Sequence, residues 1–565
     1  MSLVREWSVR KRAPAAVLDR LGVDSPLLAQ LLVNRGVASA ADARAFLAPT
    51  CDEPPDGSAL AGLGPALARI ETAVRRRERI VVYGDYDADG LSGATLLGRA
   101  LRAAGAEATV FIPHRERDGY GLNATVLEQL AHKAVGLVIT VDCGVSGVME
   151  VAAARAVGLD VIVTDHHEPP AVLPDALAIV NPRRADCPYP FKQLAGAGVA
   201  LAVARAIVRR LVPERRWDEL DDRLHELATL GTVADIMPLI GPNRAIVHRG
   251  LRVMNQRPSA GLLALFERVG ARPGEVDAST VAFKVAPRLN APGRIADASV
   301  AHHLLAAPDP GVAGRLAAEI EALNDRRKDL LADDLARARD EVLALGASLP
   351  PAVILCGDYN LGLLGLLAAR LAEETGRPVA VLNRAADVCR GSVRGIPGFD
   401  TIAAVRACHA LLERYGGHRG AAGLSVAADR LSEFERVFLA AAEEGLSRVA
   451  APEPPLADCR LRPETVTWDL TMLLGRLEPC GESNAAPRFE TRNLYVLESR
   501  VVSGGHVRLT LGAPGTRLAG IAFNAADDGP RAGQAIDVLH RVRRNVWKDR
   551  RSVELEVIGW RPARA

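Results

Sequence analysis

Carboxylates and imidazoles gather at three points of the sequence, each directly after a run of β-branched residues. The three stretches are RIVVYGDYDADGLSG (79–93), GLVITVDCG (136–144) and DVIVTDHH (160–167). Their acidic and histidine side chains are Asp85, Asp87, Asp89, Asp142, Asp165, His166 and His167. Carboxylates crowded this closely repel one another, so we expect a positive charge among them.

The placement of these side chains indicates a metal site. Ligands of open α/β sheets gather at the carboxyl ends of the strands, so the three clusters should converge on one crevice. A fourth acid, Asp235 in GTVADIMPL, follows a helix-like run and precedes a proline. Carboxylates and imidazoles without thiolates suit Mn²⁺ or Mg²⁺. The set is too large for one ion, whereas two ions about 3.5–4 Å apart activate water for displacement at phosphorus. The pattern therefore predicts two-metal phosphoester hydrolysis.

Two other interpretations of DYDADG compete with this one. The stretch matches the opening of an EF-hand loop, but Leu96 stands at the twelfth position, where that loop needs a bidentate glutamate. The other alternative is an acidic turn in which Gly90 supplies an unusual backbone angle. The pair His302 and His303 has no strand before it, so we expect it to be structural.

Strand-like and helix-like runs alternate around the clusters. Helical patterns near 93–104, 124–134 and 146–157 separate the β-branched runs, which predicts βαβ units and a parallel sheet. Helical spacing with many charges over 311–346 predicts a long connecting helix. A second, smaller α/β pattern follows. From about 457 to 562, short β-like runs predict a small barrel.

The expected fold class is α/β with a C-terminal β-barrel similar to an oligonucleotide-binding fold. The expected domains are an N-terminal helical lead-in (1–75), a metal-binding α/β domain (76–307), the connecting helix (308–348), a second α/β domain (349–450) and the barrel (456–565).

Composition excludes several classes. The chain has 565 residues, so about three or four domains are expected. The net charge of +2 gives no indication of a basic surface over the whole molecule, of the kind that attracts nucleic acid. Eight cysteines without a C-x-x-C pair argue against structural zinc and disulfides and fit a reducing cytosol. The N-terminus lacks an apolar signal region, and the longest apolar run, 194–208, is too short to span a bilayer. We expect a cytoplasmic protein with no membrane association.

The motifs GDYDADG, VDCG, TDHH and GTVAD together resemble the DHH phosphoesterase superfamily and, within it, the RecJ family of single-strand-specific 5′→3′ DNA exonucleases. Further matching stretches are RGVASAADARAFLAP (35–49), IPHRERDGYGLN (112–123), LAGAGVA (194–200), APRLNAPGRI (286–295), GSVRGIPGFD (391–400), GGHRGAAG (416–423) and LEPCGESNAAPRFE (477–490). The resemblance covers nearly the whole chain. One departure is Tyr359-Asn360, where the family usually carries Trp-His or a similar pair.

The resemblance implies roles for individual residues. The implied metal ligands are Asp85, Asp87, Asp89, Asp142, His166 and Asp235. His167 would contact the scissile phosphate or act as an acid, and Asp165 would orient the histidines. The residues implied to hold the phosphate of the 5′ end are Arg115, Ser392 and Arg394. Those implied to touch DNA near the cut are Arg288, Asn290 and His418.

Two features support single-stranded DNA without the resemblance. The glycine-rich turn around Gly417 permits close backbone approach to a phosphate chain, although a tight turn would explain it too. The stretch HRVRRNVWKDRRS (540–552) surrounds Trp547 with basic residues, which suits the binding of a single strand. A charged hairpin with a half-buried tryptophan would explain the same pattern without a ligand.

The leading hypothesis is a Mn²⁺- or Mg²⁺-dependent exonuclease that degrades single-stranded DNA to 5′-mononucleotides in repair and recombination. One alternative is a DHH enzyme for short oligonucleotides or bisphosphorylated nucleotides. Another is a non-catalytic, single-strand-binding replisome protein. We expect a monomer, and the resemblance implies a single-strand-binding protein and a helicase as partners.

Overall fold

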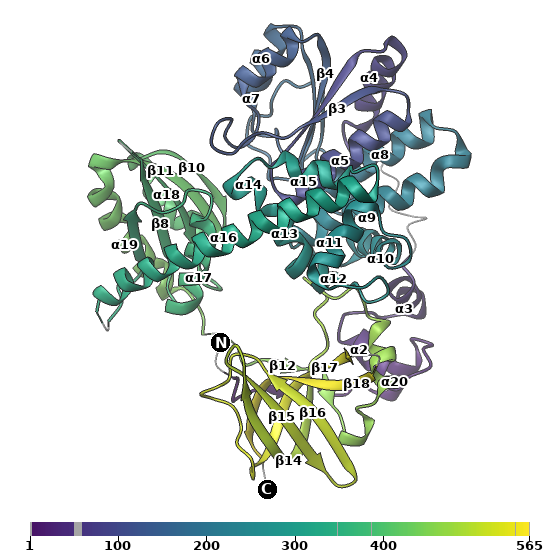
Figure 1. Ribbon diagram of the computed structural model, residues 1–565, viewed down its shortest axis with the longest axis vertical. Helices are drawn as coiled ribbons and strands as arrows, with labels where there is room; N and C mark the ends of the chain where they lie inside the picture. The colour runs from purple at the N-terminus through teal and green to yellow at the C-terminus, as the bar shows by residue number, and fades with distance from the viewer. Residues whose placement is uncertain are drawn as a thin grey trace.

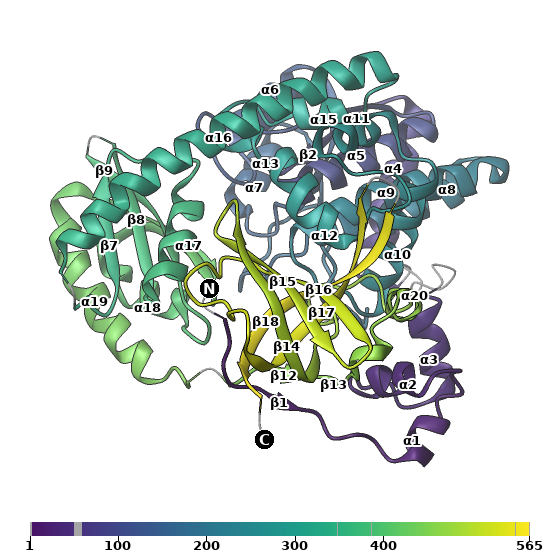
Figure 2. The ribbon, with the colours of Figure 1, turned by 60° about the horizontal axis from the view of Figure 1, so that its bottom comes forward.

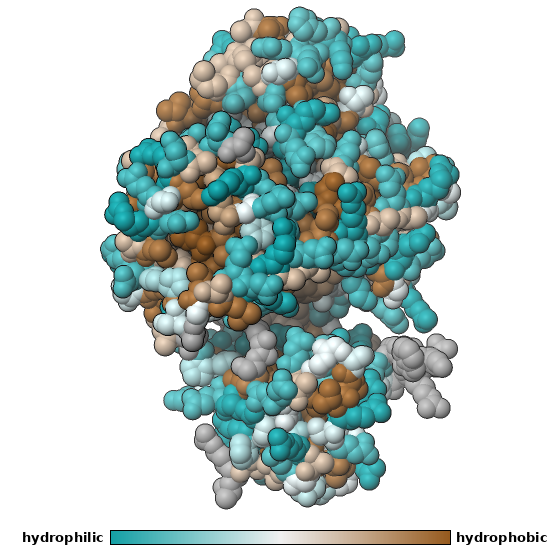
Figure 3. Space-filling view, turned by 60° about the vertical axis from the view of Figure 1, so that its left-hand side comes forward, coloured by the Kyte–Doolittle hydropathy of each residue, from teal (hydrophilic) through white to brown (hydrophobic). Residues whose placement is uncertain are grey.

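The computed structural model describes residues 3–49, 59–346, 348–385, 387–451, 453–547 and 550–563. Two domains lie side by side, joined by the long helix α16 (Pro310–Ala344), and a barrel lies below them (Figure 1). In the space-filling view, the barrel meets the rest of the molecule through a narrow waist (Figure 3). This arrangement confirms the predicted fold class.

A five-stranded parallel sheet forms the centre of the first domain, in the order β3–β2–β4–β5–β6. The strands are β2 (Arg79–Gly84), β3 (Glu107–Phe111), β4 (Val135–Val141), β5 (Asp160–Thr164) and β6 (Ala178–Val180). The flanking helices are α4 (Leu63–Arg76), α5 (Ala88–Ala103), α6 (Ala124–His132), α7 (Val148–Ala156) and α8 (Gly196–Leu211). Ile80 and Val82 of β2 pack with α4, α5 and α8. Val81 and Tyr83 pack on the opposite face with α6 and α7, so the predicted βαβ layering is confirmed.

Helix α5 begins earlier than the sequence pattern predicts. It starts at Ala88 rather than near 93, because the side chain of Asp87 accepts hydrogen bonds from the backbone N–H groups of Asp89 and Gly90, each at 3.0 Å. An aspartate at this position caps the helix by satisfying N–H groups that have no partner within it. The aspartate stretch is therefore the N-terminus of a helix as well as the end of a strand.

A helical region follows the sheet. Its helices are α9 (Trp217–Ala234), α10 (Gly241–Gln256), α11 (Ala260–Val269), α12 (Ala278–Thr280), α13 (Ala286–Asn290), α14 (Pro292–Ile295) and α15 (Ser299–Leu305), with a π-helical turn at Val281–Val285. Asp309 then caps α16 by accepting a hydrogen bond from the N–H of Val312 at 2.9 Å. Ile320 of α16 is buried in the first domain's core, and Ala338 is buried in the second domain. The predicted connecting helix is confirmed, and it packs on both domains.

The second domain contains a five-stranded mixed sheet in the order β10–β11–β9–β8–β7. Its strands are β7 (Val353–Gly357), β8 (Val379–Ala385), β9 (Val388–Arg394), β10 (Leu412–His418) and β11 (Ala421–Ala427). Helix α17 (Leu364–Thr375) packs with α16 on one face. Helices α18 (Thr401–Ala407) and α19 (Leu431–Ser447) cover the other face.

The C-terminal barrel closes because β14 pairs with both β15 and β17. Its strands are β14 (Phe489–Val502), β15 (His506–Ala513), β16 (Thr516–Ala522), β17 (Ala535–Trp547) and β18 (Arg550–Pro562). The short strand β13 (Cys459–Arg460) pairs with β14. Helix α20 (Trp468–Gly475) lies between β13 and β14 in the sequence. The predicted small barrel is confirmed.

The helical stretch expected over residues 1–75 is divided between two cores. Helices α1 (Ala15–Asp19), α2 (Pro26–Val33) and α3 (Ala40–Leu47) pack with the barrel, beside which they lie in Figure 2. Strand β1 (Ser8–Val9) pairs in parallel with β12 (Leu456–Ala457). Helix α4 belongs instead to the core of the first sheet. None of the helices in the described part of the chain has the length and hydropathy that a membrane crossing requires.

Candidate active site

The three sequence clusters meet at one edge of the first sheet. Asp85 follows β2, Asp142 follows β4, and Asp165 follows β5, so all three lie at the carboxyl ends of neighbouring parallel strands. Asp235 comes from the C-terminal end of α9. Its carboxylate lies 3.6 Å from Nε2 of His166, so the helix brings the fourth acid to the same place.

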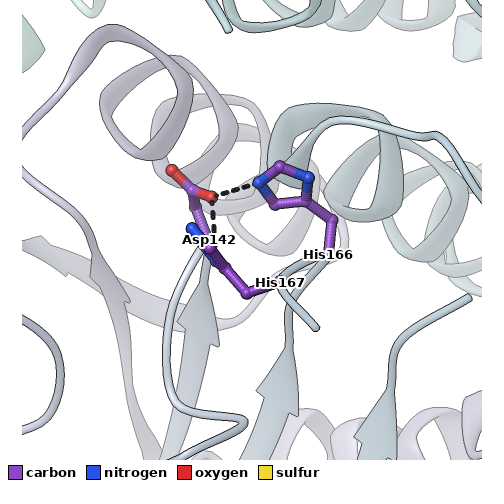
Figure 4. Close-up of side chains that lie close together, drawn as sticks. All are labelled: Asp142, His166 and His167. Carbon is purple, nitrogen blue, oxygen red and sulfur yellow. Dashed lines mark ion pairs between the residues drawn. The ribbon is translucent and has the colours of Figure 1, made fainter. Parts of the chain in front are cut away.

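Three overlapping groups of side chains could each hold a metal ion. They are Asp85–Asp87–Asp142, Asp89–His166–Asp235 and Asp142–His166–His167, and within each group the ligand atoms lie within 4.8 Å of one another. Figure 4 shows the two histidines directed at the same carboxylate, that of Asp142. Its Oδ1 lies 3.0 Å from Nε2 of His166 and 3.8 Å from Nδ1 of His167. Asp142 belongs to two of the three groups.

The electrostatics of this cluster require cations. Oδ1 of Asp142 and Oδ2 of Asp235 are buried and have no hydrogen-bond partner. Burial, and then the charge of Asp87, raises the pKa of Asp85 to about 8 and that of Asp235 to about 7. Burial also lowers the pKa of His166 to about 3, which leaves its imidazole neutral and able to ligate. Buried oxygens and a neutral imidazole fit divalent ions such as Mn²⁺ or Mg²⁺.

Backbone contacts hold the aspartates in place. Both oxygens of Asp89 accept hydrogen bonds from the first N–H groups of α8, from Gly196 at 2.7 Å and from Ala197 at 2.8 Å. The N–H of Ala88 donates to Oδ1 of Asn290 at 2.7 Å, which fastens the start of α5 to α13. Gly90 leaves room for the turn, because a Cβ there would lie 2.5 Å from the backbone nitrogen of Asp85. The site is therefore built across α5, α8 and α13.

Asp165 accepts hydrogen bonds from four donors and so has little capacity left for a metal. The backbone N–H groups of Val145, His166 and His167 donate to it at 2.9, 2.7 and 3.1 Å. Nδ1–H of His167 donates to it at 2.8 Å. Burial lowers the pKa of His167, but the hydrogen bond and charge of Asp165 outweigh that effect and raise it to about 9. The geometry fits a carboxylate that orients a cationic His167.

Tyr120 is a site residue that the sequence reasoning missed. Its hydroxyl lies 3.3 Å from Nε2 of His167, and its ring stands edge-on to that imidazole with the centroids 6.4 Å apart. The residue is nevertheless 58% exposed. The signal was available, because Tyr120 lies inside the motif IPHRERDGYGLN. An exposed aromatic ring beside the metal ligands offers a surface on which a nucleobase can stack.

Four arginines gather where the two α/β domains meet. Arg115 and Arg394 were expected here, whereas Arg294 and Arg327 were missed. In the part of the chain that the structure describes, no carboxylate lies within 4.0 Å of any of the four. Nη1 of Arg394 donates to Oγ of Ser392 at 2.8 Å, and Nε of Arg115 donates to the carbonyl of Gly293 at 2.9 Å.

The charges of this arginine cluster act on one another. Burial, and then the charges of Arg115 and Arg327, lowers the pKa of Arg294 to about 10. Nη1 of Arg294 donates to the carbonyl of Gly362 in the second domain at 3.3 Å, and Nε of Arg327 is buried without a partner. Guanidinium groups that lack carboxylates form a site for an anion such as phosphate. Arg294 lies in the motif APRLNAPGRI, but Arg327 sits in the charged pattern of α16, which gave no such signal.

The other residues predicted to contact DNA differ in whether their side chains are available to a ligand. Arg288 forms a two-pronged ion pair with Glu321, at 2.5 and 2.8 Å, and Asn290 is occupied by α5, so both side chains already have protein partners. His418 is exposed on its strand. Its pKa is lowered by partial burial and then by the charges of Arg394, His167 and Arg183. The effect of His167 shows that His418 lies near the metal cluster. The side chain of Trp547 lies outside the described residues.

Gly417 occupies a backbone conformation that only glycine adopts readily. Its φ is +149°, and a Cβ would lie 2.3 Å from the carbonyl oxygen of Ala421. The GGH strand β10 is exposed along most of its length, so its backbone is open to a ligand. Glycine at this point is required by the hairpin itself, and the same lack of a side chain permits close approach of a phosphate chain.

Tyr359, half of the pair that departs from the family pattern, faces the interior. It is 2% exposed, and its hydroxyl donates to Oε1 of Glu341 on α16 at 2.8 Å. The N–H of Asn360 donates to Oδ2 of Asp334, also on α16, at 3.1 Å. The pair therefore fixes the second domain to the connecting helix.

Family models match three segments of the chain. Residues 79–232 match the DHH family, N-terminal domain. Residues 351–444 match the DHHA1 domain, and residues 457–559 match the RecJ OB domain. The metal cluster lies mainly in the first match, Arg394 and His418 lie in the second, and the third covers the barrel.

Curated relatives extend the match to the full length. The single-stranded-DNA-specific exonuclease RecJ of Escherichia coli is 33% identical over 584 residues, which covers 98% of this chain and 98% of the relative. The chain belongs to the RecJ family. RecJ of Bacillus subtilis is 34% identical over 94% of this chain and 67% of its own length. The crystal structure of RecJ in complex with Mn²⁺ from Thermus thermophilus matches with a TM-score of 0.82 and 31% identity, over 100% of this chain and 80% of the other.

Proposed function

We propose that this RecJ-family protein hydrolyses single-stranded DNA from the 5′ end and releases 5′-mononucleotides, with two divalent metal ions, Mn²⁺ or Mg²⁺. The observation that carries the proposal is the cluster of buried carboxylates and neutral His166 whose orphaned oxygens need cations. The relatives named above are single-stranded-DNA-specific exonucleases, and one was crystallised with Mn²⁺.

Six side chains form the proposed metal-binding set: Asp85, Asp87, Asp89, Asp142, His166 and Asp235. When bound, the two ions would activate a water and stabilise the oxygens of an in-line displacement at phosphorus. Asp142 belongs to two of the three ligand groups, so we assign it the bridging position. Asp89 holds its orientation through the N–H groups of Gly196 and Ala197.

His167 is the proposed contact to the scissile phosphate. Asp165 keeps it protonated and holds Nδ1, so Nε2, which lies 3.3 Å from the exposed Tyr120 hydroxyl, is the atom that would meet a phosphate oxygen or deliver a proton to the leaving oxygen. Half of the side chain remains accessible, with 44% exposure. Asp165 thus serves as a positioning residue rather than as a metal ligand.

The arginine cluster supplies the selectivity for a 5′ end. Arg115, Arg394 and Ser392 would bind the terminal phosphate, and Arg294 would add charge from the side of the first domain. A cluster of guanidinium groups that binds a terminal phosphomonoester favours the end of a strand, because only the end carries that dianionic group. Arg288 and Asn290 keep a positioning role, because their side chains are committed to Glu321 and to Ala88.

Gly417, His418, Tyr120 and the barrel residue Trp547 are the proposed contacts to the strand. His418 comes from the second domain and Tyr120 from the first, so a strand that touches both passes between the domains. We further propose that the protein acts as a monomer in the cytoplasm, in repair and recombination. A single-strand-binding protein and a helicase would supply its substrate.

Cleavage of labelled oligonucleotides tests the proposal. A single strand labelled at its 5′ end, the same strand labelled at its 3′ end and a blunt duplex are incubated with Mn²⁺, Mg²⁺ or EDTA. We expect immediate release of 5′-labelled mononucleotide, gradual shortening of the 3′-labelled strand and an intact duplex. No hydrolysis with either metal would indicate a binding protein instead. Cleavage confined to strands of a few nucleotides would indicate an enzyme for short substrates.

A further inference from the structure

A second group of arginines lies at the opposite end of α5 from the metal cluster. Arg99 and Arg102 stand on successive turns near the C-terminus of this helix, and Arg216 comes from the turn before α9. Together with Ala103, Leu220 and Ala306 they line a pocket of about 380 Å³. The rise of 1.5 Å per residue places Arg99 about 18 Å along the helix from Asp87.

The three guanidinium groups have no acidic partner. Among the residues that the structure describes, no carboxylate lies within 4.0 Å of Arg99, Arg102 or Arg216. The charge of Glu226 acts on Arg99 from beyond ion-pair distance, and this carboxylate already binds Nη1 of Arg223 at 3.3 Å and the N–H of Ser259 at 2.8 Å. The guanidinium groups of this pocket therefore have no direct counterion among the described residues.

The two helix arginines are held in the pocket by backbone carbonyls. Nη2 of Arg99 donates to the carbonyl of Leu305 at 3.4 Å, and Nη1 of Arg102 donates to that of Ala108 at 3.2 Å. Gly98 lies beneath Arg102, since a Cβ there would approach Nη1 at 3.3 Å. Each guanidinium has five donor hydrogens, so most remain free for a ligand. Burial lowers the pKa of both side chains, as expected for cations that have lost water without gaining a counterion.

We propose that this pocket binds a phosphate group, either inorganic phosphate or the phosphomonoester of a mononucleotide. Arginine forks match the oxygens of phosphate, and three such groups on one side neutralise a dianion. One wall of the pocket is apolar and is formed by Ala103, Leu220 and Ala306. It can contact the uncharged part of a small ligand whose phosphate binds the arginines. The site is separate from the arginine cluster between the domains, because it lies at the far end of α5.

Thermal unfolding and calorimetry with defined anions test this proposal. Both are measured in EDTA and in an Arg394→Gln background, which weakens the other phosphate site. Inorganic phosphate is compared with chloride at equal ionic strength, and deoxyadenosine monophosphate is compared with deoxyadenosine. We expect phosphate to raise Tm saturably and deoxyadenosine to have no effect. If deoxyadenosine monophosphate binds more tightly than inorganic phosphate, the ligand is a phosphomonoester. If the two bind equally, the ligand is inorganic phosphate.

Pocket variants decide whether the effect belongs to this site. Arg99→Gln/Arg102→Gln should lose at least half of the phosphate-induced rise in Tm, and its Tm in chloride should not fall, because like charges are removed. Arg216→Gln changes an exposed side chain and provides a second variant that leaves the core intact. Arg272→Gln changes an exposed arginine that does not line the pocket, so it is the matched control and should keep the full response. Folded pocket variants that keep the full response, or a parent protein that shows none, would overturn the proposal.

Discussion

His166 and Asp142 lie 3.0 Å apart, measured from Nε2 to Oδ1, although they follow different strands of the sheet. Oδ1 of Asp142 accepts no hydrogen bond, so the short distance does not neutralise the carboxylate. An imidazole nitrogen this close to an unsatisfied carboxylate oxygen is arranged for a shared ion. The pair links all three candidate ligand groups, because each of the two residues belongs to two of them, which makes it the most informative place to test the proposed chemistry.

Replacing Asp142 should abolish cleavage without abolishing DNA binding. Asp142→Asn removes a charge shared by two ligand groups, and we expect the cleavage rate to fall on the order of 10³-fold or more. DNA affinity should change little, because the arginines and the barrel are untouched. Single-turnover cleavage and fluorescence anisotropy measure the two properties. Asp175→Asn, at an exposed position, is the control and should cleave normally. Equal loss of binding and cleavage in Asp142→Asn would contradict the assigned role.

Divalent metal should stabilise the protein more at alkaline pH. The folded pKa values of Asp85 and Asp235, about 8 and about 7, lie above the unfolded value of about 3.9. Their stabilising contribution is therefore present below that unfolded value and lost as pH rises through about 7–8. Bound Mg²⁺ reverses this loss because it compensates the ionised carboxylates.

The measurement is Tm with Mg²⁺ and with EDTA, at about pH 6.8 and at about pH 8.5. Both conditions lie above the ordinary pKa of histidine, so the buried His225 and His540, with pKa values of about 4, stay mainly neutral. We expect the metal-induced increase in Tm to be larger at the higher pH. An equal or smaller increase there would show that the carboxylates are not the metal site.

Removing one arginine between the domains should weaken the preference for a phosphorylated 5′ end. Arg394→Gln loses a charge-assisted contact worth about 1.5–3 kcal/mol, which corresponds to about 10- to 150-fold in kcat/KM. The matched substrate with a 5′ hydroxyl should be cleaved at a nearly unchanged rate. Comparing the two substrates in the variant and in Arg272→Gln measures the effect. A loss that is the same for both ends would place Arg394 on the strand rather than on its terminus.

Arg244 should prove essential for the junction between the first domain and the barrel. It is 2% exposed and donates to the carbonyls of Phe46, Leu477, Glu478 and Pro479 at 2.8–3.1 Å. Arg244→Ala leaves these acceptors unpaired, and each buried one costs about 1–3 kcal/mol, so Tm should fall strongly. Arg252→Ala, exposed on the same helix, should change Tm little. A mild effect of Arg244→Ala would mean that water replaces the guanidinium.

Ile236, directly after Asp235, holds a backbone conformation whose relief should stabilise the protein. Its φ is +55°, a conformation that is unfavourable for a β-branched residue, and its side chain is 70% exposed. Ile236→Asn accepts this conformation better, so the protein should gain about 1 kcal/mol in EDTA. Denaturant unfolding in EDTA measures the gain, and an unchanged or lower free energy of unfolding would contradict the prediction.

Local sequence patterns were sufficient to predict the helices and strands and most of the residues of the metal cluster. Alternating strand and helix patterns predicted the parallel sheet, and a parallel sheet brings Asp85, Asp142 and Asp165 to one edge whatever packs around it. The long helix was predicted because its charge pattern is continuous from 311 to 346. The capped start of α5 at Asp87 was missed because an N-cap changes the helix boundary without changing the hydrophobic pattern.

Contacts between distant segments were decided by the tertiary structure. Arg327 reaches the arginine cluster only because α16 packs across both domains, and Arg288 meets Glu321 because α16 packs on α13.

By itself, the sequence determined the strand ends, the family motifs and the acids and histidines at the metal cluster, because these depend on local order along the chain. Only the tertiary structure decided that Trp7 is buried against the barrel, with its Nε1–H donating to Glu490 at 3.2 Å, and that Ser8 pairs with Leu456. Pairing between segments so far apart depends on the burial of complementary surfaces, which no local spacing encodes.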